Sequence, residues 1–205
     1  MATGDTKLSI CSDSLILLGA SPLSSFSEGT DAAQICDRLF DDIRDTVLQM
    51  YPWSFTYKKS QLARTTNTPV NEYQYEFTLP SDRLGSGVRA IYNSNAIGAL
   101  TLNTGWEIFG SSVFSSETTL FADYQFRPSE DVMPTYFIQL LKNWLAWHIA
   151  EAVTDQLTKA DYYKQIACGL PSENMRGGMF RQSTQIDAQS RPSWQIDDFD
   201  LTAVR

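Results

Sequence analysis

The spacing of the hydrophobic residues changes twice along this 205-residue chain, and these changes limit the folds that it can form. Up to about residue 50, apolar side chains recur every three or four positions, as on one face of a helix. From Tyr73 to Leu79 they alternate with polar side chains, which is typical of a half-buried strand. After Pro134 the helical spacing returns. The chain therefore predicts an α+β fold, a small α-helical bundle with an inserted antiparallel β-sheet region.

Two helices are predicted before residue 52. The first runs from about Thr6 to Leu18 and ends at Gly19. The second begins where Asp31 and Gln34 resemble a capping pair, and Pro52 ends it, because proline cannot donate the next helical hydrogen bond. Leu8, Cys11, Leu15 and Leu18 form the apolar stripe of the first helix, and Ile35, Leu39, Ile43 and Val47 that of the second. The charged residues of the second helix, Asp37, Asp41, Asp42, Arg44 and Asp45, are interpreted as a solvated face.

Strands are predicted between these helices and the next helical segment. The candidates are residues 73–79, 88–92, 97–102, 106–109 and 120–126, with Asn103-Thr104-Gly105 as a turn. Residues 64–128 therefore form the predicted β insertion. It divides a helical bundle made of residues 1–63 and 129–170.

Pro134 suits the first position of a third helix. The apolar face of this helix is made by Phe137, Leu141, Trp144, Leu145, His148 and Ala152. A shorter helix is expected at residues 159–168, closing at Gly169. Beyond Asn174 the chain becomes rich in Gly, Ser, Gln and Arg without a sustained apolar period. We therefore predict an extended C-terminal arm at residues 171–205.

The composition narrows the range of partners and compartments. A net charge of −8 without a run of Lys and Arg argues against wrapping nucleic acid through phosphate contacts. Cys11, Cys36 and Cys168 are odd in number and form no CxxC pair, so neither a disulfide framework nor a zinc site is expected. The longest apolar run near the N-terminus, residues 15–20, is too short for a signal peptide or membrane span. We expect no membrane partner, and assembly in a reducing cytoplasm.

The chain lacks the motifs of common active sites. There is no GxGxxG, GxxxxGK[ST] or HExxH, so no nucleotide cofactor or catalytic metal is predicted. His148 is the only histidine, and its place on an apolar stripe favours a packed core residue. We therefore expect no enzymatic activity. Two alternatives stay open, namely a hydrolase or lyase that uses His148 with a carboxylate, and a monomeric cytoplasmic binding module.

Four short segments occur in an order that resembles one protein family. They are Ile10–Ala20, Tyr51-Pro52-Trp53-Ser54-Phe55, Leu79-Pro80-Ser81-Asp82 and Met133-Pro134-Thr135-Tyr136-Phe137. In this order and at these separations they are similar to the head-to-tail adaptors of short-tailed bacteriophages, also called tail tubular protein A or gatekeeper. The resemblance extends from about Leu8 to Thr154, and the long helix of the family is interrupted here by Gly169-Leu170-Pro171 and Gly177-Gly178.

The resemblance implies a structural virion protein without cofactors. Its copies would form a dodecameric ring that joins the portal protein to the tail nozzle protein and surrounds the channel for double-stranded DNA. The location would be the head-to-tail junction of the virion. The C-terminal arm is apolar enough to need a partner, and we expect it to dock between portal subunits with Trp194 as its anchor. The predicted partner-binding residues are Trp194, Ile196, Phe199, Leu201 and Val204.

Overall fold

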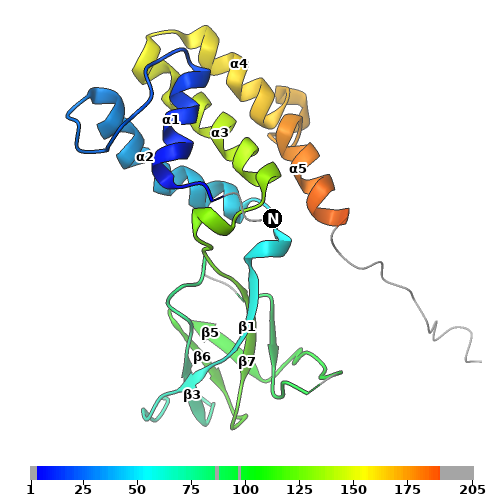
Figure 1. Cartoon of the computed structure of the whole chain (residues 1–205). Coiled ribbons are helices and arrows are strands. Elements are labelled where there is room, and N and C mark those ends of the chain that lie inside the picture. The colour runs from blue at the N-terminus through cyan, green and yellow to red at the C-terminus, as the bar shows by residue number, and fades with distance from the viewer. Residues whose placement is uncertain (1–3, 86–87, 97, 190–205) are drawn as a thin grey trace, which may run out of the picture.

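The computed structural model describes residues 4–85, 88–96 and 98–189, and these form a helical bundle joined to a β-sheet region (Figure 1). Five α-helices and two antiparallel sheets are present within these residues, which confirms the predicted α+β fold. Helix α3 (Thr135–Thr154) lies in the bundle among the other helices. The strands lie beyond the opposite end of the bundle from α4 (Leu157–Cys168), and the two parts meet at a narrow neck (Figure 1). Within the described residues no helix is long and apolar enough to cross a membrane.

The two N-terminal helices begin at threonine caps. Helix α1 (Lys7–Leu17) starts where the Thr6 hydroxyl accepts a hydrogen bond from the Ser9 amide at 3.2 Å. Helix α2 (Asp31–Gln49) starts in the same way at Thr30, whose hydroxyl accepts from the Ala33 amide at 3.3 Å. The predicted pairing of Asp31 with Gln34 is therefore wrong by one position. Asp31 instead occupies the first turn, where its negative charge interacts favourably with the positive end of the helix dipole.

The bundle has a continuous apolar core around α3. Phe137, Leu141 and Leu145 on α3 are completely buried, and α1, α2, α4 and α5 (Gly178–Gln189) pack around them. His148 does not belong to this core, contrary to the prediction. Its imidazole is exposed on α3 and stacks on Trp147 with a 4.2 Å separation of the ring centres. Ala152, also predicted on the apolar face of this helix, is exposed as well, so the predicted face is wrong at two of its six residues.

The C-terminal arm is shorter than predicted. Residues 171–189 are not extended, because a short 3-10 turn at Pro171–Glu173 leads into α5. Helix α5 buries Phe180, Ser183 and Asp187 against the bundle. These three positions share one helical face, but two of them are polar, so the segment shows no apolar period. The remainder of the predicted arm, residues 190–205, lies outside the described residues.

Seven strands form two antiparallel sheets. The first has the order β1 (Tyr57–Gln61), β7 (Phe121–Gln125), β4 (Ala90–Tyr92). The second has the order β2 (Ala63–Arg64), β3 (Tyr75–Thr78), β6 (Ser112–Ser115), β5 (Trp106–Phe109). A separate small core holds this part together, made by Leu62, Phe77, Leu79, Ile91, Val113, Leu120, Ala122 and Tyr124.

The β region differs from the prediction at three points. It begins at Tyr57 rather than at residue 64, because β1 pairs with β7 along its whole length. Residues 98–102 contain no strand, although Leu102 donates a backbone hydrogen bond to Ile91 at 2.7 Å. Strand β6 was not predicted, and it pairs with both β3 and β5. The strands at 75–78, 90–92, 106–109 and 121–125 lie within their predicted ranges.

Candidate assembly surfaces

Three of the four segments that define the family resemblance, all except Ile10–Ala20 of α1, lie at the neck between the bundle and the β region. Trp53 lies at its centre, fully buried, and its indole N–H donates to the Val47 carbonyl at 3.1 Å. Its ring contacts the edges of Phe137 and Phe180, with ring centres 5.1 and 6.0 Å away. Trp53 thus joins the end of α2, the start of α3 and α5. Pro52 ends the helix so that this side chain can turn into the core.

Strand β7 is tied to α2 by a glutamine at the same neck. The Gln125 side-chain amide donates to the Leu48 carbonyl at 2.7 Å and to the Tyr51 carbonyl at 3.3 Å. These carbonyls belong to the C-terminal end of α2 and the residues after it, where helical partners are missing. The hydrogen bonds give the β region a defined attachment to the bundle.

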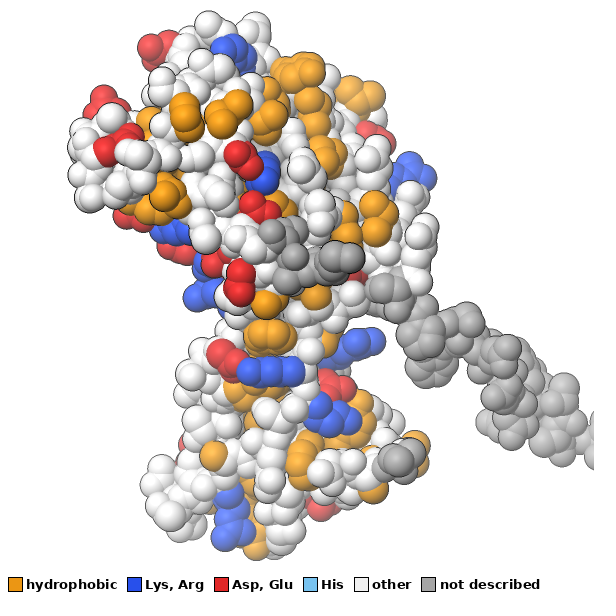
Figure 2. Space-filling view, viewed as in Figure 1, with side chains coloured by type: hydrophobic (Ala, Val, Ile, Leu, Met, Phe, Trp, Pro, Cys, Tyr) orange, Lys and Arg blue, Asp and Glu red, His pale blue; other side chains and the backbone are white. Residues whose placement is uncertain are grey.

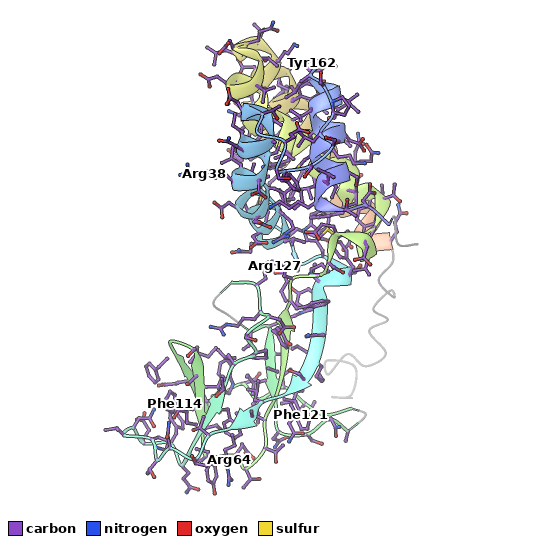
Figure 3. The ribbon with its side chains drawn as sticks, turned by 60° about the vertical axis from the view of Figure 1, so that its left-hand side comes forward. Arg38, Arg64, Phe114, Phe121, Arg127 and Tyr162 are labelled. Atoms are coloured by element: carbon purple, nitrogen blue, oxygen red, sulfur yellow. The ribbon has the colours of Figure 1, made fainter. Side chains whose placement is uncertain are left out.

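Asp82 ends the Leu79-Pro80-Ser81-Asp82 segment and connects it to both neighbouring strands. Its carboxylate accepts from the Tyr124 hydroxyl at 3.0 Å and from the Lys58 ammonium. These contacts lower the pKa of Asp82, the hydrogen bond from Lys58 being the larger cause. Arg127 also lies at the neck (Figure 3) and pairs with Asp45 of α2. The neck is therefore stabilised by ion pairs at its surface and by the packing of aromatic side chains around Trp53 in its interior.

A buried carboxylate attaches α5 to this neck. Asp187 is fully buried and accepts hydrogen bonds from the Ser54 hydroxyl at 2.7 Å, the Ser54 amide at 3.0 Å and the Tyr136 hydroxyl at 2.7 Å. Burial, followed by the hydrogen bond to Asp187, raises the pKa of Tyr136. We call Ser54, Tyr136 and Asp187 the Asp187 cluster. It fixes the place from which the last sixteen residues continue, because α5 ends two positions later at Gln189.

The predicted partner-binding residues lie in that last segment. Trp194, Ile196, Phe199, Leu201 and Val204 are all outside the described residues. The structure brings their attachment point, α5, to the side of the bundle near the neck (Figure 1).

Exposed apolar side chains occur on both parts of the molecule. On the bundle, Ile16 and Leu17 of α1 and Leu157 and Tyr162 of α4 are exposed, and Figure 2 shows apolar side chains gathered over this part. These helices are also joined directly, because Lys159 donates to the Leu18 carbonyl at 2.7 Å. The two helices that carry these side chains are far apart in the sequence. Exposed apolar side chains gathered in one region are typical of a protein interface.

A second apolar surface lies on the β region. The loop between β2 and β3 and the β5–β6 hairpin enclose a groove of about 560 Å³. Val70 and Phe109 are exposed at this groove, and the Phe109 ring lies 5.7 Å from that of Phe114. Figure 3 shows Phe114 far from Tyr162, at the opposite part of the molecule. The chain thus offers apolar contact area at two separated places.

The excess of acidic residues belongs to the helices and to the C-terminal segment. Residues 57–127 contain equal numbers of acidic and basic residues, whereas the whole chain has 24 acidic and 16 basic ones. Asp37, Asp41 and Asp42 are exposed on α2, as predicted, and Asp31 and Arg38 are exposed on the same helix, with Arg38 pointing away from the bundle (Figure 3). Asp45 is only partly exposed, and Arg44 departs from the predicted solvated face. It is buried and pairs with Asp41, Asp45 and Glu130.

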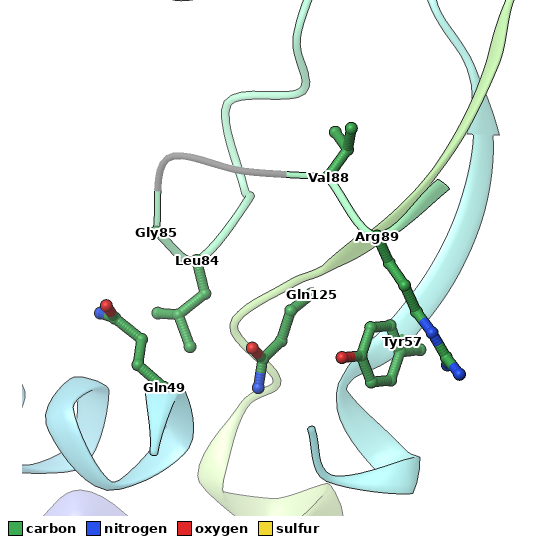
Figure 4. A pocket seen from close by; sticks show the side chains of 7 residues that line it. All are labelled: Gln49, Tyr57, Leu84, Gly85, Val88, Arg89 and Gln125. Atoms are coloured by element: carbon green, nitrogen blue, oxygen red, sulfur yellow. The ribbon is translucent and has the colours of Figure 1, made fainter. Parts of the chain in front are cut away.

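A polar pocket of about 340 Å³ adjoins the neck (Figure 4). Gln49 of α2, Tyr57 of β1 and Gln125 of β7 line it, together with Leu84, Gly85, Val88 and Arg89. The Arg89 guanidinium lies 5.0 Å from the centre of the Tyr57 ring. The polar groups that line the pocket include one guanidinium and two side-chain amides. They do not form a set of a nucleophile with a general acid and base, as an active site would need.

The residues considered for catalysis are not brought together. The His148 ring stacks on Trp147. The protein atoms around this ring desolvate it and so lower the pKa of His148, although the residue is exposed by its surface area. Its imidazole forms no hydrogen bond to a carboxylate within residues 4–85, 88–96 and 98–189. Over the same residues no group of three or more His, Cys, Asp or Glu side chains is arranged to hold a metal ion.

Sequence reasoning missed the Asp187 cluster and the groove at Phe109. The cluster is made by polar side chains that are distant in the sequence, and the groove forms only where a loop and a hairpin come together. Comparison with protein-family models and with curated proteins finds no match to this chain.

Proposed function

We propose that this protein is a structural virion component, an adaptor whose copies form a ring between a portal and a tail nozzle. The observation that supports this most is that three of the four resemblance segments meet at one neck. Tyr51–Phe55 and Met133–Phe137 are distant in sequence, yet the Trp53 and Phe137 ring centres lie 5.1 Å apart, and the Tyr51 carbonyl accepts from Gln125 of β7. Asp82, which ends Leu79–Asp82, accepts from Lys58 and Tyr124 with its carboxylate and from the Arg127 amide with its carbonyl. Their order therefore corresponds to one structural joint, as expected if a common fold underlies the resemblance.

The two apolar surfaces fit a protein that contacts different neighbours. One surface lies on α1 and α4 and the other on the β region, so a single copy can bind two partners at once. In a ring each copy presents unlike faces to its two neighbours, and such contacts close only at a set rotation. A portal ring of fixed symmetry would supply that rotation. The acidic surface of α2 is compatible with a channel in which DNA phosphates are repelled and slide.

The C-terminal segment is proposed to dock between portal subunits. It begins three residues after Asp187, directly after α5, so the buried cluster holds its starting point on the bundle. Large aromatic side chains in a pocket contribute much of the binding free energy of many interfaces. Trp194 is therefore the proposed anchor, supported by Ile196, Phe199, Leu201 and Val204.

The test is co-sedimentation of the full chain with the portal ring encoded by the same genome. We expect Trp194→Ala to weaken binding by about tenfold or more, the loss typical of a central aromatic anchor. The neighbouring Gln195→Ala is the matched control and should bind as the native chain does. Equal binding of the two variants would contradict the docking role of Trp194. No binding of the native chain would contradict the adaptor function itself.

A further inference from the structure

One side of the sheet β1–β7–β4 belongs to no apolar core. Along β7, Ala122 and Tyr124 are buried in the small β core, whereas Phe121 and Asp123 lie on the other side and are partly exposed. The register places further side chains on this second side, namely Tyr57, Lys59 and Gln61 of β1 and Tyr92 of β4. We call this side of the sheet the open face. Figure 3 shows its Phe121 in a different part of the β region from Phe114 of the groove.

Two cations lie over tyrosine rings at the open face. The Lys59 ammonium is 3.5 Å from the centre of the Tyr92 ring and 3.8 Å from the Asp123 carboxylate. The Arg89 guanidinium lies beside the Tyr57 ring (Figure 4), and no carboxylate of the described residues is within 4.0 Å of it. Cations next to exposed aromatic rings suit a ligand that carries both carboxylates and apolar side chains.

The last sixteen residues of the chain have this complementary chemistry. From Trp194 to Asp200 the sequence contains three aspartates and no basic residue, interspersed with Trp194, Ile196 and Phe199. The other apolar surface of the β region matches this segment less well. The groove at Phe109 is lined by Glu76 and by no lysine or arginine. Only the open face offers both kinds of contact within the described β region.

The Asp187 cluster fixes the start of this segment close to the open face. The Asp187 carboxylate accepts from the Ser54 amide at 3.0 Å, and β1 begins three residues after Ser54. Helix α5 ends at Gln189, two residues after Asp187. The five residues from Gln189 to Trp194 can span up to about 17 Å, and the whole segment up to about 55 Å. A strand of five residues is only about 17 Å long, so the segment can follow the entire open face.

We propose that residues 190–205 of the free chain bind to the open face of their own subunit. The carboxylates of Asp197, Asp198 and Asp200 pair with Lys59 and Arg89, while the apolar side chains of the segment pack against the aromatic rings of the face. The residues involved are those assigned above to portal docking, so the two bound states exclude each other. The open face thus covers Trp194 until another partner takes up the segment.

The experiment is fluorine NMR of the folded full chain labelled with 5-fluorotryptophan. Trp194→Phe identifies the resonance of Trp194 by its loss. In the full chain this resonance should differ from that of a labelled synthetic peptide of residues 190–205, because the indole leaves water for an aromatic surface. The difference should persist on dilution, since the contact lies within one subunit.

Matched variants locate the contact. Lys59→Glu combined with Arg89→Glu should move the Trp194 resonance towards that of the peptide, with the ratio of bound to unbound segment reduced by roughly fivefold. Arg64→Glu is the control, because Arg64 also lies over a tyrosine, with its guanidinium 4.7 Å from the centre of the Tyr75 ring, but in the other sheet. It should leave the resonance unchanged. Circular dichroism verifies that each variant is folded.

Three results would overturn this assignment. The first is a Trp194 resonance in the full chain that equals that of the peptide, which means that the segment is unbound. The second is a shifted resonance that the two substitutions on the open face do not change, which places the segment elsewhere. The third is a shift that disappears on dilution, which means that a second copy is the partner. None of these measurements includes a portal, so they test this inference separately from the proposed function.

Discussion

Asp187 brings three separate segments of the chain together with one carboxylate. It accepts from the Ser54 amide and hydroxyl, just after α2, and from the Tyr136 hydroxyl at the start of α3. Hydrogen bonds to a charged acceptor in a buried place contribute more than ordinary ones, and a donor left without its acceptor is costly. A single side chain thus connects α5 with the neck.

Replacing this carboxylate by an amide tests that connection. Asp187→Asn keeps the shape but puts an NH₂ group opposite a Ser54 or Tyr136 donor, so we expect a loss of about 2–3 kcal/mol in the free energy of unfolding. Gln185→Ala, on the exposed side of the same helix, is the control and should change it by no more than about 0.5 kcal/mol. Urea denaturation measures both. Equal stability of Asp187→Asn and the native chain would show that the cluster does not hold α5.

Glu28 gives a prediction about pH. Its carboxylate accepts from the Thr30 hydroxyl at 2.8 Å and from the Ser24 hydroxyl and amide at 2.8 and 3.0 Å. These bonds, that from Thr30 first, lower the pKa of Glu28 to about 2, below the value of about 4.3 in an unfolded chain. The stabilisation is therefore fully present above pH ~4.3 and is lost as the pH falls towards about 2.

The measurement compares the melting temperature of the native chain with that of Glu28→Gln across this range. The native chain should be the more stable at neutral pH, and the difference should shrink as Glu28 becomes protonated. Glu151→Gln is the control, since the exposed Glu151 carboxylate forms no hydrogen bond within the described residues. A difference between native chain and Glu28→Gln that stays constant down to about pH 2 would contradict the role of this carboxylate.

At the scale of elements, the helices with apolar stripes and four of the strands follow from the sequence. Strand β1 does not, because Lys58 and Lys59 are adjacent and both packed over aromatic rings, which hides the alternation. Helix α5 does not either, because Ser183 and Asp187 take two of its buried positions. A periodic pattern of hydrophobic residues reveals the buried face of a helix only where the buried residues are themselves apolar. The partners of Asp187 are distant in sequence, so no local pattern indicates them.

Two truncations separate α5 from the segment after it. A chain ending at Gln182 loses Ser183 and Asp187 and should melt at a clearly lower temperature. A chain ending at Gln189 keeps the whole of α5, so it should melt within a few degrees of the full chain but bind the portal poorly. Differential scanning calorimetry and co-sedimentation give the two readings. Equal melting temperatures of the two truncated chains would show that α5 does not belong to the bundle.

At the scale of the whole molecule, the chain consists of an acidic helical bundle and a β region with equal numbers of acidic and basic residues, which are joined at the neck. Each part has exposed apolar side chains that could contact another protein, on α1 and α4 in the bundle and on the β5–β6 hairpin in the β region. In the proposed ring these parts would face different neighbours while the neck sets the angle between them.

The most direct test of the adaptor proposal is electron microscopy of portal rings incubated with the full chain. The account predicts an added ring of density with the rotational symmetry of the portal, one copy for each portal subunit, and a loss of that density when the chain ends at Gln189. Portal particles without added density, or with a single asymmetric copy, would contradict it.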